Sequence, residues 1–298
     1  MDTEKTILEN DRLLIEVNRS GSELARIYDK KKNREVLWDA KPEIWSRHAP
    51  ILFPFVGKCF EGQYCYEGTT YSMTPHGFAR DSQFDLSFAT DTEVWYQLTD
   101  STDTYQNYPF HFKLEAGHRL KDNQITVSWR VTNTDSKELL FMLGGHPAFN
   151  VPAGNTLYDF TFEFAGQDSL KQELHYEAPD GNGYADASKE GTLHLSDGRV
   201  PLTKGFFDEV LTYIFDGAQV ARASLLLPGG EPYVTLHTAG IPYMGVWTTE
   251  ATHPFVCLEP WFGRCSDKGF TGELRDRTGI VRLGVGEGFE AHYVIEIH

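Results

Sequence analysis

The 298-residue sequence has few cysteines, too few basic residues to balance its acids, and no long apolar run. Its four cysteines are too sparse for a disulfide scaffold and lack zinc-ribbon spacing. Lys plus Arg is 27 and Asp plus Glu is 43, a net charge of −16, which argues against nucleic acid or an anionic membrane as partner. No stretch reaches the roughly 18 apolar residues of a membrane helix. The first residues do not combine a basic segment with an apolar core, so we expect no secretory signal. We therefore expect a cytoplasmic protein with neither a nucleic-acid nor a membrane partner.

Motifs for nucleotide, metal and serine-hydrolase chemistry are also missing. The glycines in residues 284–288 lack G-x-G-x-x-G spacing, and no G-K-[ST], H-E-x-x-H or G-x-S-x-G occurs. The eleven histidines could in principle build a metal site, but those in strand-like segments are typical of exposed or locally bonded side chains. We expect no bound metal and no nucleotide cofactor.

Alternation of apolar and polar residues with period two dominates the chain. In residues 125–132, Ile, Val, Trp and Val face one side while Thr, Ser, Arg and Thr face the other. Turn residues separate such segments, and no 12-residue window has convincing helical periodicity. The pattern predicts one large all-β domain over residues 1–298, an antiparallel sandwich or barrel. The polar stretch 177–190 is expected to be a surface loop. Strands are expected at residues 13–17, 23–28, 94–98, 110–116, 125–132, 139–143, 160–164, 221–227, 233–238, 256–258 and 292–297.

Four segments do not fit a purely structural sandwich. Each is apolar and interrupted by glycine or proline, yet each carries charged or titratable side chains. The segments are residues 45–58, 74–81, 143–150 and 255–263, and the side chains are Arg47, His76, Arg80, His146 and Glu259. A carboxylate beside an apolar strand, as at Glu259, is costly unless it is paired or used. The segments therefore predict a polar cleft floored by aromatic residues, with a His and a Glu able to act as an acid/base pair. Such a cleft is also typical of a sugar-binding site.

The sequence also allows purely structural roles for three of these side chains. Arg47 could be an exposed loop cation, and Arg80 could simply pair with Asp81. His146 could be a core histidine whose hydrogen bonds are satisfied locally.

Together the four segments resemble the aldose 1-epimerase (galactose mutarotase-like) family. The branch associated with lactose operons is the closest in appearance, and the glucose-6-phosphate 1-epimerases are further relatives. The resemblance rests on Arg47 with A-P-I-L-F-P-F-V-G at residues 49–57, H-G-F-A-R-D at 76–81, G-H-P-A-F at 145–149 and L-E-P-W at 258–261. It spans essentially the whole chain. It implies a large antiparallel β-sandwich, the supersandwich of the mutarotase fold, and a cofactor-free interconversion of the α and β anomers of an aldose.

The same resemblance implies roles for individual residues. His146 falls at the position of the family's general acid and Glu259 at that of its general base. Arg47 and His76 fall at substrate-binding positions. Arg80 matches the arginine that lies near the phosphate in the sugar-phosphate branch.

An aspartate on a later strand also binds sugar hydroxyls in this family. Asp208 is the first candidate here and Asp216 the second, and no motif fixes the choice. The galactose mutarotases proper have a longer histidine-containing segment where this chain has H-G-F, so galactose specificity does not carry over. The basic side chains of Arg47, Lys58 and Arg80 make a sugar phosphate a second candidate substrate beside a free hexose.

The chemistry of mutarotation suits these residue types. The C1 hydroxyl loses a proton while the ring oxygen gains one; the ring opens to the aldehyde and closes on the other face. A carboxylate base and an imidazolium acid on opposite sides of one pyranose can do this without a metal or a nucleophile. Reference pKa values of about 4.3 for Glu and about 6.5 for His predict an ionised Glu259 and a partly protonated His146 near neutrality.

Two alternative functions are weighed against this one. A non-catalytic carbohydrate-binding or sensing module could use the same fold, although binding alone does not require both His146 and Glu259. A glycoside hydrolase or lyase would normally need two carboxylates beside the scissile bond, and only Glu259 is a convincing one.

Overall fold

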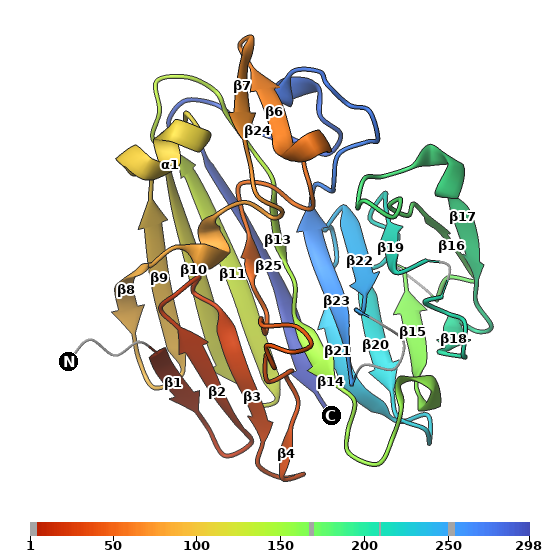
Figure 1. Ribbon diagram of the computed structural model, residues 1–298. Coiled ribbons are helices and arrows are strands. Elements are labelled where there is room, and N and C mark those ends of the chain that lie inside the picture. Colours follow the sequence, from red (N-terminus) through yellow and green to blue (C-terminus); the bar gives the residue numbers. More distant parts are fainter. Residues whose placement is uncertain (1–4, 167–169, 209, 250–253) are drawn as a thin grey trace.

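The computed structural model describes residues 5–166, 170–208, 210–249 and 254–298, and strands dominate it (Figure 1). The largest sheet is antiparallel, with the strand order β18 (Arg199–Pro201), β15 (Thr161–Ala165), β20 (Arg222–Leu226), β21 (Pro232–His237), β25 (Gly288–Ile297), β11 (Gln124–Asn133), β10 (Phe112–Lys121), β9 (Glu93–Thr99) and β8 (Asp85–Ala89). The second sheet has the order β19 (Thr212–Phe215), β22 (Tyr243–Trp247), β23 (Phe255–Phe262), β13 (Leu143–Gly145) and β5 (Ile51–Leu52), and β14 (Ala148–Asn150) also pairs with β23.

Smaller elements surround these two sheets. A four-stranded sheet consists of β1 (Lys5–Glu9), β2 (Leu13–Asn18), β3 (Leu24–Asp29) and β4 (Arg34–Glu35). Three two-stranded sheets pair β6 (Gln63–Tyr66) with β7 (Thr69–Ser72), β12 (Leu139–Phe141) with β24 (Val281–Leu283), and β16 (Glu173–Tyr176) with β17 (Gly191–His194). The helical elements are α1 (Thr102–Asn107) and the 3-10 turns η1 (Phe60–Gly62), η2 (Ala79–Asp81), η3 (Leu157–Asp159), η4 (Ala187–Lys189) and η5 (Leu274–Asp276). None of the described helices is long and apolar enough to cross a membrane.

Aromatic side chains join the two large sheets. Phe164 on β15 packs against Phe215 on β19 with ring centroids 5.4 Å apart, and Phe262 on β23 packs against Phe289 on β25 at 5.1 Å. Each such ring removes a large apolar area from water, and this burial drives the sheets together. The predicted all-β fold, a large antiparallel sandwich, is confirmed.

Every strand expected from the alternation overlaps an observed strand, with two informative differences. The expected strand at 139–143 is two strands, β12 and β13, which pair with different partners. The expected strand at 256–258 continues to Phe262, so Glu259 lies within β23 rather than after it. Both faces of β23 are covered, which makes its sequence an apolar run with no alternation to mark its end.

Candidate active site

A cavity of about 540 Å³ opens on the face of the second sheet that points away from the main core. Along β23, Val256 and Leu258 join the main core, whereas Glu259 and Trp261 line the cavity. This division follows from the period of two along a strand, which sends alternate side chains to opposite faces. β23 therefore supplies the floor of the cavity with one carboxyl group and one indole.

Glycines on the neighbouring strands make room for that indole. A Cβ on Gly245 of β22 would lie 2.6 Å from the Trp261 ring, and one on Gly144 of β13 would also lie 2.6 Å from it. No real Cβ makes so short a contact, so both positions require glycine while Trp261 lies flat across the sheet. The pairs Gly245–Glu259 and Gly144–Trp261 are direct cross-strand neighbours.

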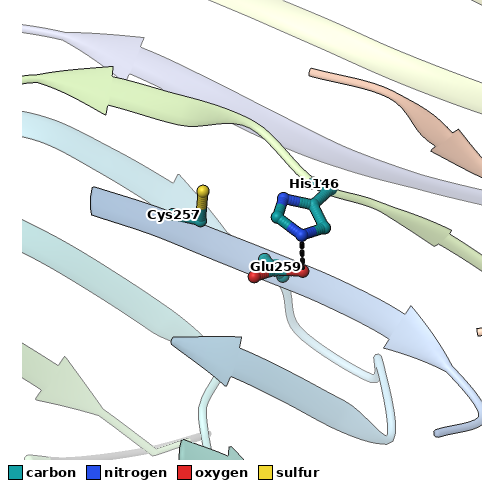
Figure 2. A group of neighbouring side chains, drawn as sticks. All are labelled: His146, Cys257 and Glu259. Carbon is teal, nitrogen blue, oxygen red and sulfur yellow. Dashed lines mark ion pairs between the residues drawn. The ribbon is translucent and has the colours of Figure 1, made fainter. Parts of the chain in front are cut away.

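His146 and Glu259 are in direct contact in this cavity, so the expectation that they lie on opposite sides of a pyranose is wrong for this structure. His146 follows β13, and its Nε2 lies 3.0 Å from Oε2 of Glu259 (Figure 2). Both side chains are buried, 8% and 1% exposed. Neither His146 Nδ1 nor Glu259 Oε2 makes a well-formed hydrogen bond to another described residue. Buried polar atoms without such partners are costly, which marks both side chains as candidates for a functional role.

Three aromatic rings hold the His146 imidazole. Trp45 stacks on it with ring centroids 5.0 Å apart, Trp247 meets it edge-on at 5.3 Å and His76 at 5.5 Å. All three also line the cavity. The imidazole orientation is thus fixed by packing on several sides, as a proton-transfer group requires.

Burial changes the charge expected for the pair. It raises the pKa of Glu259 well above its usual value and lowers that of His146 to about 3, with nearby Arg80 and Arg47 adding to the second shift. Both directions run against the expectation of an ionised Glu259 and a partly protonated His146 in the resting protein. Reference pKa values describe solvated groups, whereas removal from water favours the neutral form of both.

Backbone contacts with Gly57 position His76. The Gly57 amide donates to His76 Nδ1 at 3.2 Å, and the His76 amide donates to the Gly57 carbonyl at 2.9 Å. Nδ1 is therefore an acceptor, so in the neutral ring Nε2 carries the proton and can donate. Burial, with the positive charges nearby, lowers the His76 pKa well below its usual value and keeps this ring neutral. Its φ of 66° lies in the left-handed region, a strained conformation for histidine that these two bonds help maintain.

The structure places the two predicted arginines differently. Arg80 lines the cavity, whereas Arg47 lies beside it and pairs with Asp81 at 2.7 Å. Arg80 also approaches Asp81, at 3.7 Å, so the structural explanation of an Arg80–Asp81 pair holds in part. Burial and the neighbouring Arg47 lower the Arg80 pKa to about 10, which leaves it charged at neutral pH.

Of the two candidate aspartates, Asp208 lines the cavity. Asp216 does not, and its carboxylate instead accepts a hydrogen bond from the Gln219 side chain at 3.0 Å. His146, Glu259, His76, Arg80 and Asp208 thus meet at one cavity.

The sequence missed one wall of this cavity. Residues 179–183 and Lys189, inside the expected surface loop, line it together with Lys58. Lys58 Nζ donates to the Asn182 carbonyl at 2.9 Å, and Lys268 anchors the loop through Asp186 at 3.3 Å. The turn residues of this stretch reveal a loop, but nothing local indicates where it packs.

Cys257 lies next to the pair and completes a group of three metal-ligand types. Ligand atoms of His146, Cys257 and Glu259 lie within 4.8 Å of one another (Figure 2). A thiol must lose its proton to bind a metal, and burial raises the Cys257 pKa well above its usual value. Cys257 packs in an apolar cluster with Trp38, Ala148 and Phe255. The thiol is thus better suited to packing than to metal binding.

Comparison with known proteins identifies the family of this chain. The family model described as aldose 1-epimerase matches residues 4–267. The chain belongs to the aldose 1-epimerase family. It is 25% identical over 294 residues to the chromosomal protein LacX of Lactococcus lactis subsp. lactis, covering 93% of each chain.

Two solved structures support the family at the level of the fold. A galactose mutarotase related enzyme from Lactobacillus acidophilus has a TM-score of 0.91 at 28% identity, covering 99% of this chain and 97% of the other. A galactose mutarotase-like protein from Lactobacillus casei has a TM-score of 0.88 at 29% identity, covering 99% and 100%. The expected resemblance to the lactose-operon branch is confirmed, and the family places the protein among carbohydrate epimerases.

Proposed function

We propose that the protein interconverts the α and β anomers of a hexose or hexose phosphate by acid/base ring opening at His146 and Glu259, without a cofactor. The observation that carries this proposal is the 3.0 Å contact between these two buried side chains at the cavity. The ring oxygen and the C1 hydroxyl oxygen of an aldose are bonded to the same carbon. An acid and a base that serve them must therefore lie close together, as this pair does.

In the neutral resting pair, Glu259 carries the proton that His146 needs in order to act as the acid. Transfer of the Glu259 proton to His146 gives a carboxylate and an imidazolium. The carboxylate then takes the C1 hydroxyl proton while His146 protonates the ring oxygen, and the bond from C1 to the ring oxygen breaks to give the aldehyde. This step returns the neutral pair, which is the state required for ring closure from the other face. General acid and base catalysis each typically contribute about 10²- to 10⁴-fold.

The other predicted residues would hold the sugar. His76 can donate from Nε2, Asp208 can accept from hydroxyls, and Arg80 carries a charge at the cavity wall. Arg47 would act beside them, through the carboxylate of Asp81 that it shares with Arg80. The rings of Trp45 and Trp247 offer apolar faces for a pyranose.

Anomer exchange measured by NMR tests the proposal. Free hexoses and hexose 6-phosphates are compared with and without the protein, and with the variants His146→Asn and Glu259→Gln. We expect each substitution to remove most of the catalysed exchange, about 10²-fold or more, while the fold persists. Near-wild-type exchange in either variant would reject the acid/base assignment.

The alternative function, a non-catalytic carbohydrate-binding module, predicts a different result in the same experiment. Sugars would bind measurably, yet no sugar would exchange anomers faster. The contact between His146 and Glu259 supports catalysis, because simple recognition does not need an acid and a base in contact. The cytoplasmic location and the identity of the sugar stay predictions.

A further inference from the structure

Arg277 is buried without a carboxylate partner among the described residues. It is 3% exposed and follows the turn η5. Its guanidinium donates to the thiol of Cys59 at 2.8 Å and lies 4.9 Å from the Phe55 ring centroid. Burial raises the pKa of this thiol, so the sulfur stays neutral and supplies no countercharge. Burying a cation is unfavourable unless its hydrogen bonds offset the hydration that it loses. The remaining contacts of Arg277 must therefore stabilise its charge.

Those contacts are main-chain carbonyls from two walls of the cavity. Nη2 of Arg277 donates to Val56 at 3.2 Å, to Lys58 at 3.3 Å and to Arg264 at 3.1 Å. Val56 and Lys58 flank Gly57, and Arg264 precedes Cys265. Both Gly57 and Cys265 line the cavity. Arg277, which does not itself line the cavity, therefore bonds the two wall segments together.

The two walls meet where Arg277 joins them. Gly57 has a φ of 68°, and a Cβ there would lie 2.5 Å from Cβ of Cys265. The Gly57 backbone is thus pressed directly against Cys265. From this position Gly57 makes its two bonds to His76, one to Nδ1 and one to the backbone amide.

We infer that Arg277 is a positioning residue that acts through Gly57 on His76. The guanidinium fixes the carbonyls on both sides of Gly57, so the Gly57 amide points at His76 Nδ1. That bond favours the tautomer in which Nε2 carries the proton, and it holds His76 edge-on to His146. A lysine cannot reproduce this, because its single ammonium lacks the planar fork that reaches Cys59 and three carbonyls at once.

The kinetic test of this inference rests on the proposed function, whereas the test by the His76 imidazole spectrum does not require activity. The variants are Arg277→Met and Arg277→Lys, with Arg34→Met as the control for loss of a partly buried arginine. Arg34 likewise stacks on an aromatic ring, Tyr233 at 4.6 Å, and donates to the His298 carbonyl. Unlike Arg277 it also pairs with the buried Asp29, at 3.4 Å, and it lies on β4 and does not line the cavity.

The first measurement is the ¹⁵N spectrum of the His76 imidazole. We expect a single tautomer with hydrogen-bonded Nδ1 in the wild type and in Arg34→Met, and a mixture of tautomers in both Arg277 variants. An unchanged His76 spectrum in a folded Arg277 variant would overturn the inference. If Arg277→Met does not fold, Arg277→Lys decides, because it retains the buried charge.

The second measurement is the catalysed anomer exchange in a double-mutant cycle with His76→Ala. We expect Arg277→Lys to lower kcat/KM by about 10- to 100-fold in the wild-type background, and by less than about twofold when His76 is already absent. Equal losses in both backgrounds would contradict action through His76. If the wild type catalyses no exchange, the proposed function fails, and the imidazole spectrum still decides the role of Arg277.

Discussion

The charge state of Glu259 leads to a prediction about stability that does not depend on the substrate. Burial raises the pKa of Glu259 well above the unfolded value of 4.5, so the folded protein holds this proton where the unfolded chain has lost it. Stability from this group therefore falls as pH rises above 4.5, until the pH passes the folded-state pKa. The slope is about 1.4 kcal/mol per pH unit for one proton.

His146 has the opposite effect at lower pH. Its folded pKa of about 3 lies below the unfolded value of 6.5, so folding releases a proton between these values and stability rises with pH there. Between pH 4.5 and 6.5 the two slopes cancel, because the unfolded carboxylate and imidazolium hold as many protons as the neutral folded pair. Above pH 6.5 only the loss from Glu259 remains.

The substitution Glu259→Gln isolates this effect, because glutamine keeps the shape and cannot ionise. We expect the unfolding free energy of the variant, minus that of the wild type, to rise with pH above 5.5, by about 1.4 kcal/mol for each pH unit that lies below the folded-state pKa of Glu259. Urea unfolding at pH 5.5, 6.5 and 7.5 measures this difference. Glu16→Gln is the control: ion pairs with Lys5 and Arg26 lower the Glu16 pKa, so its effect is constant over this range. A constant difference for Glu259→Gln as well would show that Glu259 is charged in the folded protein.

Two other predictions concern the floor and the wall of the cavity. Gly245→Ala should lower the free energy of unfolding by about 1–3 kcal/mol and slow anomer exchange, because the new Cβ would lie 2.6 Å from the Trp261 ring. Thermal unfolding measures the loss of stability. The control is Gly288→Ala, whose Cβ would meet nothing within 4 Å. Arg80→Ala should lower kcat/KM for a hexose 6-phosphate by about 10- to 100-fold more than for the free hexose, since one charge-assisted hydrogen bond is lost; equal losses for both sugars would remove the phosphate role.

The strands were predictable from the sequence because the alternation of residues reports burial on one face. In β11 the alternating burial follows the sequence pattern almost residue by residue. The pairing order was not predictable, because register depends on partners far apart in the chain. The C-terminal strand β25, for example, lies inside the largest sheet, between β21 and β11.

The site was predictable at positions where a charged or titratable residue was out of place in its sequence segment. Glu259 stood out as a carboxylate in an apolar segment, and His146 as a histidine among glycines. The wall at residues 179–183 gave no such signal, because its contact with Lys58 joins residues 124 positions apart. The charge state of the pair was also hidden, since it depends on a burial that only the folded structure reveals.

The separation of the acid and the base distinguishes the reaction classes that this fold could host. Glycosidases hold two carboxyl groups roughly 5 to 9.5 Å apart, because a sugar ring, with or without a water, must fit between them. His146 and Glu259 approach to 3.0 Å, which leaves no room for that arrangement. Two oxygens on one carbon, however, can be reached by a contacting pair. The contact thus supports the proposed epimerisation at C1 over cleavage of a glycosidic bond.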